Sequence, residues 1–488
     1  MEIAGVSRRK LLQGIGGLTA LGMMGSAKPF SWLQAAQLPV PGAADWSRFG
    51  YDIHNTRFNP MEKTIGRNNV ERLKEKWRFD TDENWVIQQT PSVIGNTVFF
   101  GSGRYQFAVD SATGKPRWKY DWGADGEWER TVWQGTLKNR GTRSSPQYAN
   151  GRIYFGTGTC AVFCVDVATG QKVWKTRLLD DERLERMEGQ IFYSPVLSKG
   201  KVFIGYSGGD ATLYCLDAET GAIRWDFRIA QDVPKEERTG GGSMWTSGAV
   251  DEENNIIYTV TGSNKAFLPN LMLYSESVLA HDMDTGELLW YYQAHPQDSF
   301  DLDFCAHPMV FDAEAPARVR GDVRPCVAAG NKAGIYCWNR YSGELYWRVM
   351  LGNPSSASGP LIDAIATAYN KVYCQYASPT SAPPMAVSAA LNAYNGNIEW
   401  VRPNADMNSA PIAIANEVLY QGLVNGDFEA LDAFTGRKLW EFKMPSAFRG
   451  GAAIANGAVY AGNGEPSSWD GESIPYRHSL YCFTLDGK

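Results

Sequence analysis

Hydrophobic and polar residues alternate in short runs along most of the chain, and turn-forming residues separate these runs. A run such as "TLYCLD" (212–217) has the period of two that is typical of a β-strand. The run is followed by a hydroxyl residue with Gly, and then by Trp four residues after the Gly, as in "DAETGAIRW" (217–225). An Asp that bonds to the turn backbone and a Gly at positive φ are typical of tight hairpins. The pattern therefore predicts antiparallel hairpins with a large aromatic ring on each return strand.

The hairpin pattern occurs seven times, and its copies are 40 to 65 residues apart. The copies end at Trp118, Trp174, Trp225, Trp290, Trp347, Trp400 and Trp440. Each interval is long enough for four short strands, and a four-stranded sheet repeated at this period is typical of a β-propeller. The repeated Asp, Gly and Trp are therefore interpreted as structural, so that chemistry is expected in residues outside the repeat.

The two ends of the chain complete an eighth copy. The C-terminal stretch "SLYCFTLDGK" (479–488) contains the first half of the pattern, and "LKEKWRF" (73–79), with Trp77, supplies the missing return strand. Pairing these segments closes the ring and removes its exposed edges. The sequence predicts an all-β fold, an eight-bladed propeller of four-stranded antiparallel blades, as one domain over residues 44–488.

Composition and the N-terminus limit the possible partners and locations. The net charge is −6, and no basic cluster lies beyond the N-terminus, which argues against a nucleic-acid partner. Arg8 and Arg9 precede a short, Gly-containing apolar run that resembles a twin-arginine export signal and is too short and polar for a membrane span. Residues 1–43 are therefore expected to be an export signal and linker, with a periplasmic or secreted mature protein. The eight Cys form no CxxC or CxxCH motif, so a zinc ribbon or a covalently bound haem is unsupported.

Several stretches outside the repeat resemble the quinoprotein alcohol dehydrogenases, which use pyrroloquinoline quinone (PQQ). They are "DWSRFGYDIHNTRFNP" (45–60), "VERLKEKWRF" (70–79), "TGGGSMWTSG" (239–248), "IIYTVTGSNKAFLPN" (256–270), "HPQDSFDLDF" (295–304) and "GNKAGIYCWNR" (330–340). The resemblance covers nearly the whole chain after the predicted signal, and it implies a site at four residues. Trp245 matches the floor beneath the flat quinone, Arg140 and Lys332 match cations that pair with its carboxylates and ring oxygens, and Asp301 matches the catalytic base.

The resemblance also implies a Ca²⁺ ion. Asp210 and Asn264 match the oxygen ligands of this ion, although the family usually has Glu at the position of Asp210. Gln134 and Gly135 stand where methanol-oxidising members have two adjacent cysteines.

Three functional hypotheses follow. The first is an exported dehydrogenase in which the quinone accepts hydride from an alcohol, Asp301 removes the hydroxyl proton and Ca²⁺ acts as a Lewis acid. Because no haem motif is present, electrons would pass to a separate carrier. The second is a cofactor-free hydrolase that resembles tetrathionate hydrolases, and the third is a non-catalytic propeller for assembly in the cell envelope.

Overall fold

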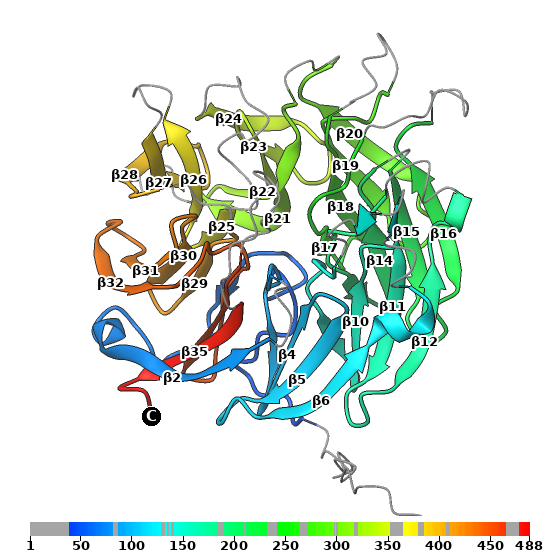
Figure 1. Cartoon of the computed structure of the whole chain (residues 1–488). Coiled ribbons are helices and arrows are strands. Elements are labelled where there is room, and N and C mark those ends of the chain that lie inside the picture. Colours follow the sequence, from blue (N-terminus) through cyan, green and yellow to red (C-terminus); the bar gives the residue numbers. More distant parts are fainter. Residues whose placement is uncertain are drawn as a thin grey trace, which may run out of the picture. The chain divides into compact units, whose positions relative to one another are not determined.

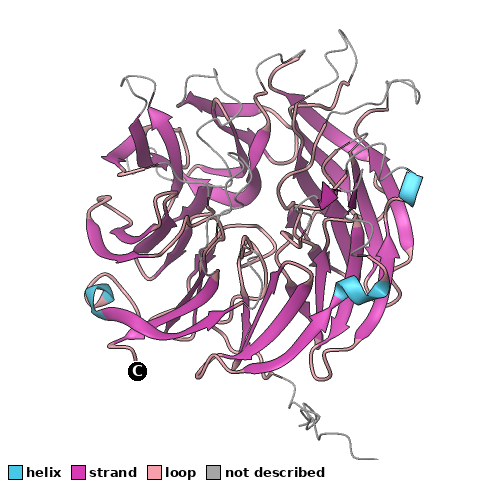
Figure 2. Cartoon of the chain, viewed as in Figure 1, coloured by secondary structure: helices cyan, strands magenta, loops and turns pink. Residues whose placement is uncertain are grey.

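Eight sheets, each with four antiparallel strands, dominate the protein, and one of them carries a short fifth strand that is parallel to its neighbour (Figures 1 and 2). The computed structural model describes residues 39–81, 86–127, 132–133, 136–137, 141–182, 189–208, 211–231, 242–263, 272–296, 298, 301–316, 321–351, 365–378, 385–406, 410–464 and 478–488. Each sheet is one blade, and its first strand is the innermost.

The first four blades run in chain order. They consist of β3 (Ser92–Ile94), β4 (Thr97–Ser102), β5 (Tyr105–Asp110) and β6 (Pro116–Asp121); β9 (Gln147–Ala149), β10 (Arg152–Gly156), β11 (Ala161–Asp166) and β12 (Lys172–Arg177); β13 (Val196–Ser198), β14 (Lys201–Gly205), β15 (Thr212–Asp217) and β16 (Ile223–Arg228); and β17 (Ala249–Asp251), β18 (Ile256–Val260), β19 (Ser277–Asp282) and β20 (Leu288–Gln293).

The next three blades follow the same order, and the last one combines both ends of the chain. They consist of β21 (Phe304–Glu314), β22 (Val323–Asn331), β23 (Gly334–Asn339) and β24 (Leu345–Met350); β25 (Ile365–Ala368), β26 (Lys371–Ser378), β27 (Met385–Asn392) and β28 (Ile398–Pro403); β29 (Ala413–Ala415), β30 (Val418–Gly422), β31 (Asp427–Asp432) and β32 (Lys438–Lys443); and β33 (Ala453–Ala455), β34 (Ala458–Gly462), β35 (Ser479–Leu485) and β2 (Leu73–Asp80). The remaining elements are β1 (Phe58–Asn59), the two-stranded sheet of β7 (Val132–Trp133) and β8 (Thr136–Leu137), and the 3₁₀ turns η1 (Val70–Arg72) and η2 (Trp122–Asp125).

The ring is closed, as the sequence predicts. Each innermost strand contacts the innermost strands of both neighbouring blades, and β33 of the last blade contacts β3 of the first. Strand β2 pairs with β35 from Leu73↔Leu485 to Asp80↔Ser479, so the N-terminal segment supplies the outermost strand of the C-terminal blade. The eight-bladed fold is confirmed.

The predicted hairpin chemistry is also present. In the first blade the Asp110 carboxylate accepts hydrogen bonds from the backbone N–H of Ala112 and Thr113 and from the Thr113 hydroxyl, over 2.9–3.1 Å. Gly114 closes the turn at φ +69°, a left-handed conformation that favours glycine.

Each repeat Trp binds to the following blade, which the sequence did not reveal. Trp118 Nε1 donates to the Val167 carbonyl, 2.8 Å away, and its ring covers Gly170, where an added Cβ would lie 2.8 Å from Trp118 Cγ. The turn glycine is therefore required by the ring of the preceding blade as well as by its own φ. The same pairing joins Trp77 to Gly114, Trp174 to Gly221, Trp225 to Gly286, Trp290 to Gly343, Trp347 to Gly396 and Trp400 to Gly436.

The segment of residues 46–59 contacts all eight blades in their order around the ring. Its contacts with the innermost strands and the residues next to them are Trp46 with Val93, Ser47 with Tyr148, Arg48 with Leu197, Ile53 with Val250, His54 with Val310, Thr56 with Thr367, Arg57 with Ile414 and Asn59 with Ile454. One short stretch of chain thus ties the whole ring together.

The middle strands are buried on both faces because every blade packs between two others. All residues of β14, β18, β30 and β34 are buried, whereas the outermost strand β16 alternates between exposed and half-buried positions. All eight Cys are buried free thiols, as expected of small core residues. Within the described residues, no helix has the length and apolar character needed to cross a membrane.

Candidate functional site

The described site residues lie on loops at one face of the ring. Trp245 lies between β16 and β17, Ser263 between β18 and β19, Asp301 between β20 and β21, and Lys332 between β22 and β23. In an antiparallel blade, the second-to-third connection and the crossing to the next blade lie at the same edge. The topology therefore brings these four loops to one face.

Asp301 and Lys332 form the centre of this site. Lys332 Nζ lies 3.0 Å from Asp301 Oδ2 and 2.8 Å from Asp303 Oδ2. The Ser263 hydroxyl donates to Asp301 Oδ1 at 2.9 Å, and the Ser263 backbone N–H donates to Asp303 Oδ1. The structure thus brings together two of the predicted residues and adds two more. Asp303 lies two residues after Asp301, in the same acidic stretch, whereas Ser263 is 38 residues away from Asp301 and was not identified as a site residue from the sequence.

The two carboxylates differ in exposure and ionisation. The Asp301 side chain is 27% exposed, whereas that of Asp303 is 4% exposed. Burial raises the pKa of Asp303. For Asp301, burial is outweighed by its hydrogen bond to Asp303 and by Lys332, which together lower the pKa. Asp301 is therefore the ionised group that a ligand can reach, while Asp303 holds Lys332 from below.

The Asp301 backbone is strained. Its φ is +63°, a left-handed conformation that is uncommon for residues other than Gly. The following residue, Leu302, donates its N–H to Asp298 Oδ2 at 2.6 Å, which fixes the loop. Such strain is concentrated at functional sites, where the surrounding structure determines the conformation.

Trp245 lies beside this group and is half-buried. Gly262 separates it from Asp303, because a Cβ added there would lie 3.1 Å from Trp245 Nε1 and 2.2 Å from Asp303 Oδ1. The Phe192 ring packs against the Trp245 ring in a tilted arrangement, with the ring centroids 4.7 Å apart and an interplanar angle of 39°. Phe192 is a site neighbour that the sequence did not indicate.

Glu276 is a second residue that the sequence missed. It is fully buried and lies at the end of the loop that contains Ser263. Burial, together with the negative charges of Asp298 and Asp303, raises its pKa to about 11, so Glu276 is protonated at neutral pH. The stretch around it reads as an ordinary strand start, so no pattern marked it.

Three predicted residues, Arg140, Asp210 and Asn264, lie outside the described residues. Within the part of the chain that the structure describes, no three His, Cys, Asp or Glu side chains are grouped to hold a metal ion.

The fold and the site define an eight-bladed propeller with an ionised Asp–Lys pair beside an aromatic platform at one face. The family model described as "Glucose/ethanol/alcohol dehydrogenase, beta-propeller domain" matches residues 46–353, and the chain belongs to this PQQ alcohol dehydrogenase-like family of oxidoreductases. A second model, described as "Outer membrane protein assembly factor BamB", matches residues 275–474.

Individual proteins agree with the family assignment. The chain is 25% identical to the quinohemoprotein alcohol dehydrogenase ADH IIB of Pseudomonas putida, over 96% of this chain and 82% of the relative. The solved quinohemoprotein alcohol dehydrogenase ADHIIG of Pseudomonas putida superposes with a TM-score of 0.80 at 19% identity, over 93% of this chain and 83% of that chain. A europium-containing methanol dehydrogenase superposes with a TM-score of 0.76 at 19% identity, over 91% of this chain and 98% of that chain. These two structures support the fold.

Proposed function

We propose that this chain oxidises an alcohol with bound PQQ and a metal ion, and that it passes the electrons to a separate carrier. Its membership of the family supports an alcohol substrate. The observation that carries the proposal is the Asp301 carboxylate, which is ionised, partly exposed, and held by Lys332 and Ser263 next to the half-buried ring of Trp245.

The described residues fit a flat, anionic quinone. Trp245 presents a ring that is only half-buried and lies outside the repeat, which suits stacking. Lys332 adds a cation at 3.0 Å from Asp301. We assign Arg140 and Lys332 to the carboxylates and ring oxygens of the quinone, and Asp210 and Asn264 to the metal ion, for which Ca²⁺ is the proposed identity. When bound, the quinone supplies the hydride acceptor and the metal ion polarises its carbonyl.

The protein's own residues move the proton. Asp301 takes the proton from the substrate hydroxyl as the carbon–hydrogen bond breaks. Lys332 keeps Asp301 ionised before this step, and Ser263 fixes the direction of its carboxylate. Asp303 holds Lys332 in place, and together with Asp301 it raises the lysine's pKa despite burial. Lys332 is therefore a permanent cation beside the base.

Reconstitution tests the proposal. Purified protein is titrated with PQQ in the presence and absence of Ca²⁺, and reduction of a dye is followed with a series of primary and secondary alcohols. The expected result is a changed cofactor absorbance and alcohol-dependent dye reduction that needs both PQQ and Ca²⁺. Unchanged absorbance and no dye reduction with any alcohol would contradict the proposal.

The BamB match over residues 275–474 supports one alternative, a non-catalytic propeller for envelope assembly. That function requires no cofactor, and it requires neither an ionised Asp301 nor a cation beside it. A protein that fails the reconstitution, and whose Asp301→Asn variant fully complements loss of the chain in cells, would favour assembly. A hydrolase of the tetrathionate type predicts instead that Asp301 is needed without PQQ.

We further propose export to the periplasm through the twin-arginine pathway, on the basis of Arg8 and Arg9. Replacing both residues with Lys is expected to retain the protein in the cytoplasm. Undiminished export of this variant, measured by cell fractionation, would contradict the assignment.

A further inference from the structure

Arg143 is a cation for which the described residues provide no counter-charge. It lies on the loop before β9, and its guanidinium carbon lies 5.0 Å from the centroid of the Phe192 ring. Among the described residues, the Arg143 side chain makes no hydrogen bond and no ion pair.

The environment of Arg143 makes this lack of pairing unfavourable. Arg143 is half-buried, and this burial, together with the like charge of Arg449, lowers the pKa of Arg143 from 12.5 to about 10. Arg449 comes from the loop between β32 and β33, so two blades place cations near each other. A desolvated arginine is usually paired with a carboxylate, because the cost of removing it from water is otherwise not offset.

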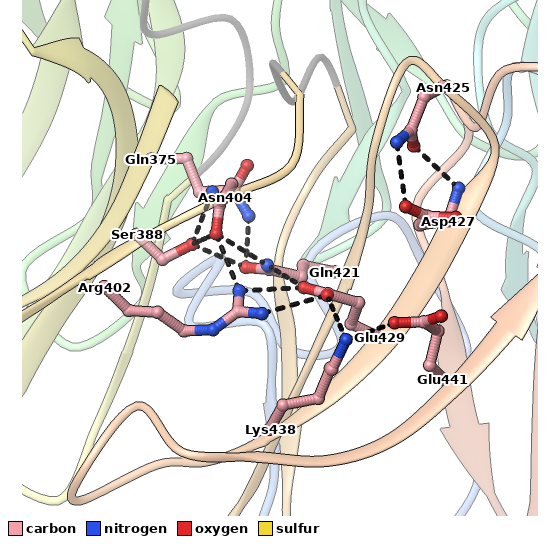
Figure 3. Close-up of polar contacts among 10 residues, drawn as sticks. All are labelled: Gln375, Ser388, Arg402, Asn404, Gln421, Asn425, Asp427, Glu429, Lys438 and Glu441. Atoms are coloured by element: carbon pink, nitrogen blue, oxygen red, sulfur yellow. Dashed lines mark hydrogen bonds and ion pairs between the residues drawn. The ribbon is translucent and has the colours of Figure 1, made fainter. Parts of the chain in front are cut away.

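Arg402 shows the usual solution in the same protein. Its Nη1 and Nη2 donate to the two carboxylate oxygens of Glu429, each at 2.9 Å (Figure 3). Arg143 has no such partner within the described part of the chain. A carboxylate of a bound ligand would supply such a partner.

The position of Arg143 indicates which ligand. Phe192 contacts both Arg143 and Trp245, and the Phe192 and Trp245 ring centroids are 4.7 Å apart. Trp245 in turn adjoins Gly262 and, through it, Asp303. The unpaired cation thus lies on the same aromatic platform as the acidic group of Asp301 and Asp303, and one flat ligand could contact both.

We propose that Arg143, with Arg449 beside it, binds a carboxylate of the ligand that lies over Phe192 and Trp245. The planar guanidinium fits a carboxylate through two parallel hydrogen bonds. The proposal rests on the proposed function only for the origin of this carboxylate, which belongs either to the quinone or to an acidic alcohol substrate.

The test uses the mature protein and three ligands, which are a planar tricarboxylate, PQQ, and a hydroxy acid that is compared with a neutral alcohol. Calorimetry measures the binding of benzene-1,3,5-tricarboxylate, a redox-inert planar acid, and of PQQ with Ca²⁺. Steady-state kinetics of the PQQ-loaded protein compare a hydroxy acid with an alcohol of the same chain length. Arg143→Gln is expected to weaken binding of the tricarboxylate by about 10- to 100-fold, the usual effect of losing one charge-assisted pair.

The stability of the ligand-free variant distinguishes a structural role of Arg143 from a role in ligand binding. Because removal of an unpaired cation eliminates a desolvation cost, the melting temperature of ligand-free Arg143→Gln is expected to equal or exceed that of the parent. Arg324→Gln is the matched control, since Arg324 also stacks on an aromatic ring, with its guanidinium carbon 3.8 Å from the Tyr394 centroid. This control is expected to bind every ligand normally.

The outcomes decide whether the anion site exists and which molecule supplies its carboxylate. Weaker PQQ binding by Arg143→Gln assigns the carboxylate to the cofactor, and loss of a preference for the hydroxy acid at unchanged PQQ affinity assigns it to the substrate. If the parent binds the tricarboxylate through Arg143 but never binds PQQ, the anion site stands and the proposed function fails. If Arg143→Gln matches the parent with all three ligands, or if the parent binds none of them, the anion site is wrong.

Discussion

Two buried polar clusters lie in this propeller, one in its wall and one on its loop face. The wall cluster joins the blades of β25–β28 and β29–β32, and it consists of Gln375, Ser388, Arg402, Asn404, Gln421 and Glu429 (Figure 3). In it, Glu429 accepts both arms of Arg402 and a 2.8 Å hydrogen bond from Gln421 Nε2. Its members come from strands or the residue directly after one, and its one buried carboxylate is neutralised.

The loop-face cluster has the opposite properties. Two carboxylates, Asp301 and Asp303, share the single cation Lys332, and Glu276 makes no ion pair among the described residues. Asp301 has a left-handed backbone and a partly exposed side chain. A network with balanced charges rigidifies the fold, whereas an unbalanced one leaves charged groups available to a ligand. The comparison is consistent with a supporting role for the wall cluster and with the catalytic role that we propose for the loop-face cluster.

Replacing Glu429 is expected to destabilise the wall cluster more than any other single change. Glu429→Ala leaves Arg402 unpaired, and we expect the free energy of unfolding to fall by about 3 kcal/mol, the lower end for a buried ion pair because Arg402 remains partly exposed. Turnover per folded molecule is expected to be unchanged. Glu399→Ala is the control, because Glu399 pairs with Lys371 near the surface and such pairs contribute at most about 1 kcal/mol. Equal stabilities of the two variants in urea titrations would show that the wall cluster is not a support.

The contact between blades is tested at Gly170. Gly170→Ala forces a methyl group against the Trp118 ring, and we expect a loss of about 1–3 kcal/mol in stability. Gly200 has a similar φ, +72° against +67°, but nothing lies within 4 Å of its added Cβ, so Gly200→Ala measures the backbone cost alone. The two variants should differ in melting temperature. If they melt together, the tryptophan contact contributes nothing beyond the turn.

The loop-face cluster is tested by pH at Glu276. Its pKa is raised from 4.5 to about 11 on folding, so the folded state keeps a proton that the unfolded state releases as the pH rises between these values. Stability from this group is therefore present below about pH 4.5 and declines towards pH 11, by at most about 1.4 kcal/mol for each pH unit. Glu276→Gln removes the titration. The melting temperature of the variant minus that of the parent should therefore become more positive from pH 5 to pH 9. If the melting temperatures of variant and parent change with pH in parallel, Glu276 is ionised in the folded protein.

The sequence was sufficient for the ring because each blade repeats the same local chemistry. The Asp–Gly turns and the Trp positions predicted eight blades and the pairing of β2 with β35, since these features depend on neighbours in the chain. The path of residues 46–59 was not predictable, because each of its contacts is made with a different distant blade.

Site residues could be predicted from the sequence only where they lie in a stretch that resembles the family. Asp301, Lys332 and Trp245 stood out from the repeat, and the structure places them on one face. No motif singled out Ser263, Phe192, Glu276 or Arg143, because their contacts are made between loops that the closed ring brings to one face. Such contacts are long-range, so alternation and turn signals contain no information about them.

The central claim is that Asp301 is the base, and one variant tests it most directly. Asp301→Asn keeps the shape of the side chain but cannot accept the hydroxyl proton. We expect it to bind PQQ as the parent does and to lose turnover by about 10²–10⁴-fold, the usual effect of a positioned general base. Asp298→Asn and Asp303→Asn, measured beside it, should lose far less turnover. A PQQ-loaded Asp301→Asn protein that turns over like the parent, or an Asp303→Asn protein that is inactive with its cofactor bound, would contradict the account.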